Sequence, residues 1–387
     1  MPTLKSERNG EKLTVWLPVR LDFENNEAVK AEIDAMIEEP TKELVFDASE
    51  MIYISSIGLR IILAAIKRIK KVSVINLSQD AHYIMTSAGF DNLIPISLAM
   101  REQSIDGAKV IGSGYNSTVY RINHDTIVKV YKDVNSLDKV EKERELAQKA
   151  FLKGVPTAIS YDVVKVGERY GLVFEMLDAG SLYQVMYENQ ADLPQIIKKY
   201  AAFIKSVNEV EFEPDELPSI AEQQKGWLED IIAPNIPASI TDFLRKLLAS
   251  IPEGHGLIHG DLQPNNIILG QEEMYIIDMD AISLGDSVFE LAGIYNFLMG
   301  FSVMKKEKFG EGDFDYPMRQ KIWDMLIAAY YEGKDAAEIE KLRHRAEALG
   351  KIKLLRWCVN HNADEFLRQE IERTQKYFAE IGEGIFA

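Results

Sequence analysis

Strand-like and helix-like segments alternate along residues 1–97. The segments LTVWLPVRL (13–21) and ELVFDA (43–48) are rich in Val, Leu and aromatic residues, as strands are. Between them, NNEAVKAEIDAMIEE places its apolar residues at helical spacing. A second helical segment, IGLRIILAAIKRIKK, follows a pair of serines, and the strand-like VSVINL comes next. The pattern predicts a compact α/β domain over residues 1–97.

The pattern changes after a short connector at residues 98–105. A glycine-rich segment, a strand, a helix and a two-stranded hairpin are expected over residues 106–178. Beyond them, nearly all of residues 179–387 has a helical period, apart from GLIHGDLQPNNIIL and MYIIDMDAI. Residues 106–387 are therefore predicted to fold as a β-rich lobe followed by an α-rich lobe.

The composition is that of an ordinary globular protein. Of the 387 residues, 47% are hydrophobic and 27% are charged, which leaves ample apolar material for buried cores. The single cysteine, Cys358, excludes an internal disulfide and a cysteine-based zinc site. No run reaches the ~18 consecutive apolar residues of a membrane span, and the N-terminus lacks the pattern of a secretion signal. We expect a cytoplasmic protein without a membrane segment.

The charge of the chain is acidic and uneven. The net charge is −17: residues 1–97 carry 11 Lys+Arg against 14 Asp+Glu, and the remaining residues carry 33 against 47. Nucleic acid is disfavoured as a partner, because phosphate backbones need clustered Lys and Arg. An acidic domain attracts cationic small molecules, although acidity can also serve solubility alone.

A glycine-rich hairpin and a lysine begin the second part of the chain. Gly112, Ser113 and Gly114 lie in IGSGYNSTV between two strand-like runs, whereas a dinucleotide fingerprint would open a helix. Such a hairpin either serves turn geometry or folds its N–H groups over nucleotide phosphates. Lys129, in the buried-strand pattern TIVKVY, can snorkel to the surface or reach those phosphates as a point charge.

A lysine in that position needs a carboxylate beside it. The next helical segment offers Glu141, Glu143 and Glu145. Glu143 lies four residues before Ala147, so the helical period places both on the inward side. We expect Glu143 to pair with Lys129.

The segment GLIHGDLQPNNIIL (256–269) carries a dense group of polar residues. Asp261 and Asn266 precede the strand-like NIIL, and Asp278 lies in the strand-like YIIDMD that follows. Asp and Asn also favour turns through local hydrogen bonds. Phosphoryl transfer, however, needs a carboxylate at the attacking hydroxyl and oxygen ligands for Mg²⁺. Asp261 fits the first requirement, and Asn266 and Asp278 fit the second.

These motifs resemble those of a known group of enzymes. HGDLQPNN and IIDMD are similar to the catalytic and metal-binding segments of the aminoglycoside phosphotransferase and choline kinase group, within the protein-kinase-like superfamily. GDSVFELAG looks like the group's GDP…DLA segment, with Asp286 aligned and Glu290 in place of the usual Asp. The resemblance covers roughly residues 107–300, with the motifs in the right order. It implies a bilobal kinase fold and a phosphotransferase with an alcohol-group acceptor.

The resemblance also implies roles for individual residues. Asp261 would be the catalytic base, and Asn266 and Asp278 would hold Mg²⁺. The co-substrate would be ATP or GTP, with the base bound by backbone groups of the FEMLDAGSL segment. Ser117 stands where protein kinases have a third loop glycine, which this group often lacks. The residues implied to bind the nucleotide are Gly112, Ser113, Gly114, Ser117, Lys129, Glu143, Glu175 and Leu177.

His255 and His259, four residues apart, raise the alternative of a zinc protease. That motif requires a glutamate directly after the first histidine, and this chain has Gly256 there. We therefore expect His259 to brace the catalytic loop by hydrogen bonding. Asp280, two residues after Asp278, either assists the metal or caps a turn.

The segment LVFDASEMIYISSIGLRIILAA (44–65) resembles the core of STAS domains, the fold of anti-sigma factor antagonists. Those domains carry a D-S-S-G-L phosphorylation motif; here Ser55 stands at the usual Asp and Ser56 at the phosphoacceptor. Ser56 is expected just before a helix, where it is either a plain N-cap or holds a phosphate against the helix dipole. The resemblance covers residues 10–97 and implies a regulatory domain that can bind a protein partner.

Three functions remain open from the sequence. The first is a kinase that moves the γ-phosphoryl of ATP or GTP to a hydroxyl of a small, amine-bearing molecule, with the STAS-like domain as regulator. The second is a signalling kinase that phosphorylates Ser56 of its own chain or a serine of a partner, which the fusion to a STAS-like domain favours. The third is a nucleotide-sensing scaffold without turnover, which the intact Lys, Asp, Asn and Asp residues disfavour.

Overall fold

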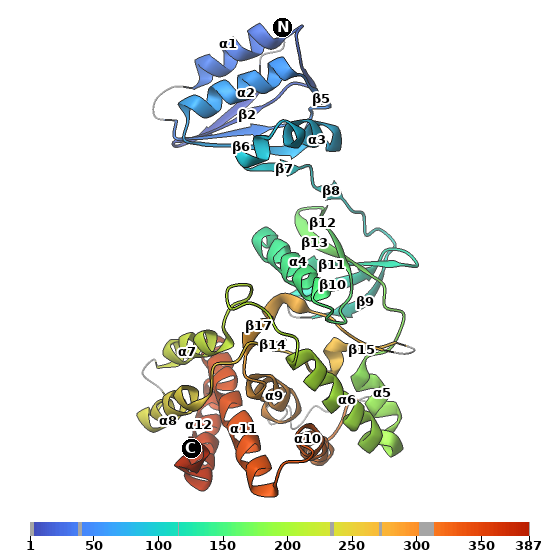
Figure 1. The fold of residues 1–387 in the computed structure, drawn as a ribbon, viewed down its shortest axis with the longest axis vertical. Coiled ribbons are helices and arrows are strands. Elements are labelled where there is room, and N and C mark those ends of the chain that lie inside the picture. Colours follow the sequence, from blue (N-terminus) through green and yellow to red (C-terminus); the bar gives the residue numbers. More distant parts are fainter. Residues whose placement is uncertain are drawn as a thin grey trace. The chain divides into compact units, whose positions relative to one another are not determined.

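The chain folds into two compact units. They span Met1–Ser104 and Ile105–Ala387 (Figure 1). None of the helices in the part of the chain that the structure describes is long and apolar enough to cross a membrane. The structure is a computed structural model and describes residues 4–37, 41–114, 116–232, 236–270, 273–301 and 313–386.

The first unit is a five-stranded sheet covered by helices. Its strand order is β1-β2-β4-β6-β7, with β1 antiparallel to β2 and the other neighbours parallel. Helices α1 and α2 lie side by side against the sheet (Figure 1). The elements are β1 (Ser6–Asn9), β2 (Lys12–Trp16), α1 (Asn26–Met36), β4 (Glu43–Asp47), α2 (Ser56–Arg68), β6 (Lys71–Leu77), α3 (Gln79–Ser87) and β7 (Ile96–Leu98).

The expected α/β class is confirmed for this unit, with one difference in the first strand. Residues 13–21 do not form one strand, because Pro18 cannot donate to a sheet ladder and β2 ends at Trp16. The chain then pairs again in a separate two-stranded parallel sheet, β3 (Arg20–Leu21) with β5 (Tyr53–Ile54). Alternate apolar residues of β2, β4 and β6 pack under α2 in one buried core.

The second unit begins with an antiparallel sheet and one helix. Strands β9 to β13 are neighbours in the order β12-β13-β11-β10-β9. Val128 and Val130 of β11 are buried in the core of this lobe, and the intervening Lys129 points to the opposite face. The elements here are β9 (Lys109–Ser113), β10 (Ser117–Arg121), β11 (Thr126–Tyr131), α4 (Leu137–Leu152), β12 (Ser160–Val166) and β13 (Arg169–Glu175).

The rest of the second unit is mainly helical, as expected. Helix α9 is apolar on all sides apart from Glu290, and it is buried, with α11 packed against it (Figure 1). Two short antiparallel strand pairs, β14–β17 and β15–β16, adjoin the segments that carry the polar motifs. The elements are α5 (Leu182–Glu188), α6 (Leu193–Asn208), α7 (Ile220–Ile231), α8 (Ala238–Ser250), β14 (Gly256–Ile258), β15 (Ile267–Leu269), β16 (Met274–Ile276), β17 (Ser283–Gly285), α9 (Val288–Tyr295), α10 (Tyr316–Tyr330), α11 (Ala336–Asn360) and α12 (Asp364–Ile381).

Candidate active site

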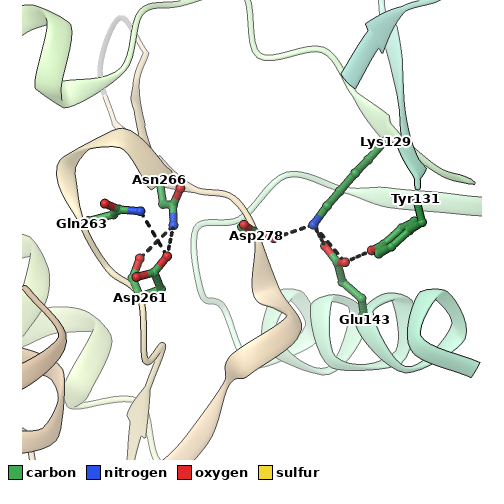
Figure 2. A network of polar contacts seen from close by, with 7 residues as sticks. All are labelled: Lys129, Tyr131, Glu143, Asp261, Gln263, Asn266 and Asp278. Atoms are coloured by element: carbon green, nitrogen blue, oxygen red, sulfur yellow. Dashed lines mark hydrogen bonds and ion pairs between the residues drawn. The ribbon is translucent and has the colours of Figure 1, made fainter. Parts of the chain in front are cut away.

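The loop between β14 and β15 fixes the carboxylate of Asp261. Asp261 Oδ2 accepts hydrogen bonds from Gln263 Nε2 (3.1 Å) and Asn266 Nδ2 (3.0 Å), as Figure 2 shows. Asn266 Nδ2 also donates to the Asp261 carbonyl at 2.9 Å, which closes the loop on itself. Gly260 allows the turn, because its φ of +79° is a left-handed conformation that other residues rarely adopt. Oδ1 of Asp261 takes no part in these amide bonds.

Lys129 lies across the cavity from this loop, and acidic side chains surround it. Its ammonium donates to both oxygens of Glu143, at 2.8 and 3.0 Å, and to Asp278 (Figure 2). Tyr131 also donates its hydroxyl to Glu143. The expected pairing of Lys129 with Glu143, rather than with the other glutamates of α4, is confirmed.

Burial shifts the titration of this pair. Burial alone would lower the pKa of Lys129, but the charges of Glu143 and Asp278 outweigh it and raise the pKa above its usual value. Burial raises the pKa of Glu143 to about 7, although the Lys129 ammonium opposes the rise. Lys129 is therefore firmly cationic, a fixed positive charge in an acidic protein.

Asp278 and Asn266 lie at the same end of the β15–β16 hairpin. The Ile277 N–H donates to the Asn266 carbonyl at 3.0 Å, which extends the strand pairing to the residue before Asp278. Asp278 adopts a φ of +71°, a strained conformation for a residue with a side chain. This turn aims its carboxylate at Lys129 instead of along the strand.

The oxygen atoms at this end of the hairpin suit Mg²⁺, which prefers a few carboxylate or amide oxygens. Asn266 points its Nδ2 at Asp261, so its Oδ1 faces away (Figure 2). Carboxylate oxygens of Asp278, Asp280 and Glu143 lie within 4.8 Å of one another. Burial, reinforced by the charge of Asp278, raises the pKa of Asp280. The acidic donor set therefore fits a magnesium ion at Asp278.

Lys129 and the carboxylates around it meet at a cavity of about 640 Å³, which the predicted Mg²⁺ ligand Asn266 does not line. The predicted residues Gly112 and Ser113 do not line it, because they pair with β10 further along the hairpin. The loop's residue 115 lies outside the described residues. The predicted residues that line this cavity are Gly114, Ser117, Lys129, Glu143, Asp261 and Asp278, with Asp280 beside them.

A second cavity, of about 350 Å³, lies at the segment between the lobes and is lined by Leu177. Glu175 does not line it. Its N–H and its carboxylate both bind the backbone of Ile159, at 3.0 and 2.7 Å, so it ties β13 to the start of β12. Of the two predicted hinge residues, the structure brings only Leu177 to a cavity.

Glu290 anchors the catalytic loop, the segment between β14 and β15 that contains Asp261; no role for this residue could be predicted from the sequence. Its buried carboxylate accepts hydrogen bonds from the N–H groups of His259 (2.6 Å), Gly260 (3.2 Å) and Leu262 (3.3 Å). Burial raises the pKa of Glu290 to about 7, against the effect of these N–H donors. The one feature of the sequence that pointed to Glu290 was its position in GDSVFELAG, where the resembling group has Asp.

His259 braces the loop as expected. Its Nδ1 accepts a hydrogen bond from the Asp261 N–H at 3.3 Å. The imidazole is fully buried, and burial lowers its pKa below the usual value. A neutral ring is what an acceptor at Nδ1 requires.

Lys353, near the end of α11, reaches the catalytic loop from far along the chain. Its Nζ donates to the Gly260 carbonyl at 3.2 Å and lies 3.6 Å from Asp261 Oδ1. No local pattern in the sequence pointed to it, since α11 follows Asp261 only after two further helices.

In the first unit, the structure corrects the role of the two serines. Ser55, not Ser56, is the N-cap of α2: its Oγ accepts from the Gly58 N–H at 3.4 Å. Ser56 is the first residue of the helix, and it is exposed. Gly58 lets β3 approach, because a Cβ there would lie 2.7 Å from the Leu21 carbonyl oxygen.

The second unit thus has the architecture and polar residues of a kinase-type phosphotransferase. The sequence model of the phosphotransferase enzyme family, APH, matches residues 107–321, and the chain belongs to this family. The sequence model of the STAS domain matches residues 4–103, so the chain also carries an N-terminal STAS domain. No curated protein sequence matches the chain.

The chain is similar to solved structures of phosphotransferases and kinases at low sequence identity. A thermostable mutant of aminoglycoside phosphotransferase APH(4)-Ia, in a ternary complex with ADP and hygromycin B, is 13% identical with a TM-score of 0.52. The match covers 72% of this chain and 94% of that one. A choline/ethanolamine kinase family protein from Mesorhizobium loti is 16% identical, with a TM-score of 0.48 over 70% of this chain and 87% of that one.

Proposed function

We propose that the protein transfers the γ-phosphoryl group of ATP or GTP to a hydroxyl group of a small molecule. The observation that carries the proposal is the fixed carboxylate of Asp261, held by two side-chain amides, in the same cavity as the Lys129–Glu143 pair and Asp278. Phosphoryl transfer needs little more from a protein than positioning and charge stabilisation.

Each polar group has a role in this reaction. Lys129 binds the phosphates, and Glu143 holds its ammonium in place. Asp278 and Asn266 would hold Mg²⁺, which would neutralise phosphate charge when bound. Asp261 orients the acceptor hydroxyl and takes its proton.

The nucleotide would span both cavities, with its base near Leu177 and its phosphates beneath the β9–β10 hairpin. Gly114, which has no side chain, and Ser117, which has a small one, line the phosphate end and would leave room for a phosphate chain. The solved phosphotransferase that shares this fold binds ADP, which is in line with a nucleoside triphosphate as co-substrate.

The acceptor is proposed to be a small hydroxyl compound that bears an amine. The support is electrostatic: the net charge of residues 98–387 is −14, and such a field concentrates cations. The STAS domain would regulate the enzyme or bind a protein partner.

A second candidate is a signalling kinase that phosphorylates Ser56 or a serine of a partner. Ser56 favours it, because the hydroxyl is exposed at the first turn of α2 while Ser55 does the capping. A phosphate at this position would meet the positive end of the helix dipole.

Incubation with Mg²⁺ and γ-labelled ATP or GTP separates the candidates. The purified protein is tested alone and with a panel of amino-alcohols, aminoglycosides and neutral sugars. Label on an amine-bearing acceptor supports the first candidate, and label only on neutral sugars rejects the amine. Label on the protein that disappears in Ser56→Ala but persists in Ser55→Ala supports the second. Binding of nucleotide with no transfer under any condition would contradict both.

A further inference from the structure

The catalytic loop has a cationic neighbour that the family's motifs do not contain. Lys353 lies on α11, beyond residues 107–321 that match the family's sequence model. Among the residues that the structure describes, it is the one cation paired with Asp261, with its Nζ 3.6 Å from Oδ1.

The position of Lys353 is built into the packing of α11 on α9. Gly350, one turn before it, has no side chain where a Cβ would lie 3.0 to 3.2 Å from Tyr295, Asn296 and Ala292. Asn296 Nδ2 also donates to the Gly350 carbonyl at 2.8 Å. This close approach of the two helices fixes the position of α11 along α9, and with it the position of Lys353 relative to the catalytic loop.

The two oxygens of Asp261 have different surroundings. Oδ2 accepts from Gln263 and Asn266, whereas Oδ1 faces Lys353. The acceptor hydroxyl must therefore bind at Oδ1, since that oxygen remains to take its proton. In a reactive complex the phosphorus lies about 3 to 3.5 Å from the acceptor oxygen. A lysine ammonium on its four-carbon stem at this distance can reach the oxygens of the transferring group.

We propose that Lys353 is a catalytic residue that binds the γ-phosphoryl group as it moves to the acceptor; this rests on the proposed function. The acceptor oxygen forms the new O–P bond with its lone pair, and its proton passes to Asp261 Oδ1. The bond from phosphorus to the β-phosphate oxygen breaks, and that electron pair leaves with the nucleoside diphosphate. During transfer the negatively charged phosphoryl group would lie between two cations, Lys353 on the acceptor side and Lys129 on the nucleotide side.

The division of labour between the two lysines follows from their partners. Lys129 is fixed by Glu143 and Asp278, at the end of the cavity below the hairpin, and would bind the phosphates that remain with the nucleotide. Lys353 is half-exposed beside Asp261, on the side where the acceptor hydroxyl would bind. Its effect should therefore depend on the presence of a γ-phosphoryl group.

The test compares ADP with ADP–aluminium fluoride, a mimic of the transferring group, by titration calorimetry in Mg²⁺. Lys353→Met should bind ADP within about twofold of wild type. The factor by which aluminium fluoride increases its affinity should, however, be about tenfold or more smaller than in wild type. Lys353→Arg, which keeps the charge, should recover part of that gain. Lys376→Met, on an exposed part of α12, is the matched control and should match wild type.

Each other outcome is informative. An equal gain from aluminium fluoride in Lys353→Met and wild type would overturn the assignment and leave the proposed function standing. Equal losses for ADP and for the mimic would mean that Lys353 only supports the loop, which also rejects it. A wild-type protein that gains nothing from aluminium fluoride would contradict the proposed function and the inference together.

Discussion

Two buried carboxylates, Glu143 and Glu290, fix different parts of the site. Glu143 fixes the Lys129 ammonium, and Glu290 collects three backbone N–H groups of the catalytic loop. Both have a raised pKa because both are removed from water. Their partners differ, so their removal should have different consequences.

Lys129→Met should damage both stability and binding. The substitution leaves the Glu143 carboxylate buried without its cation, so we expect the second unit to lose about 3 kcal/mol of unfolding free energy. Nucleotide affinity should fall at least about tenfold, because a charged contact with phosphate is lost. Adding Glu143→Gln should restore most of the stability but none of the affinity. Denaturant unfolding and calorimetry measure both quantities; full stability in the single variant would contradict the coupling.

Glu290 should make the stability of the second unit depend on pH. Its folded pKa of about 7 lies above the usual 4.5, so the folded state binds more protons between these values. The contribution is complete below pH about 4.5 and is lost as pH rises through about 7. The stability of wild type relative to Glu290→Gln should therefore fall by up to about 3 kcal/mol over this window. An unchanged difference across the window would show that the carboxyl titrates normally; Glu380→Gln, on exposed α12, is the control.

At the scale of elements, the contact between α9 and α11 positions the catalytic loop, because Glu290 on α9 and Lys353 on α11 both bind it. Gly350→Ala should push these helices apart and cost about 1 to 3 kcal/mol, since the neighbours of the new methyl group include backbone and ring atoms. Phosphotransfer should fall as well, because Lys353 follows one turn later. Gly226→Ala in α7 is the matched control: nothing lies within 4 Å of a Cβ there, so it should be neutral or stabilising. Equal effects of the two substitutions on unfolding and activity would contradict this account of Gly350.

Most elements could be predicted because their periods are local properties of the chain. The strand around Lys129 and the helix of Glu143 were expected, and their pairing followed from the helical face of Glu143. The contact of Lys353 with Gly260 could not be predicted, because it depends on how α11 packs against α9. The N-cap was assigned one residue too late, since a pair of serines gives no periodic signal to choose between them.

At the scale of the whole molecule, each unit has a core of its own. Among the described residues, the buried members of the first unit's core all lie between Leu13 and Ile94, and the partly buried side chains packed against them also belong to this unit. We expect two unfolding transitions in calorimetry, of which Mg²⁺ and ADP raise only one. At a ligand concentration of about 100 times Kd, the stabilisation should be about 2.7 kcal/mol. Lys129→Met, with its affinity at least about tenfold lower, should reduce this stabilisation to about half or less. A shift of both transitions would contradict independent cores.

The most direct measurement compares wild type with Asp261→Asn for the transfer of γ-label from Mg²⁺–ATP to the hydroxyl acceptors of the panel. Asparagine keeps the size of the side chain but cannot take the hydroxyl proton, so transfer should fall about a thousandfold. Nucleotide affinity, measured on the same samples, should stay near that of wild type, since Lys129 and Asp278 are untouched. Undiminished transfer by Asp261→Asn would contradict the claim that this carboxylate drives the reaction.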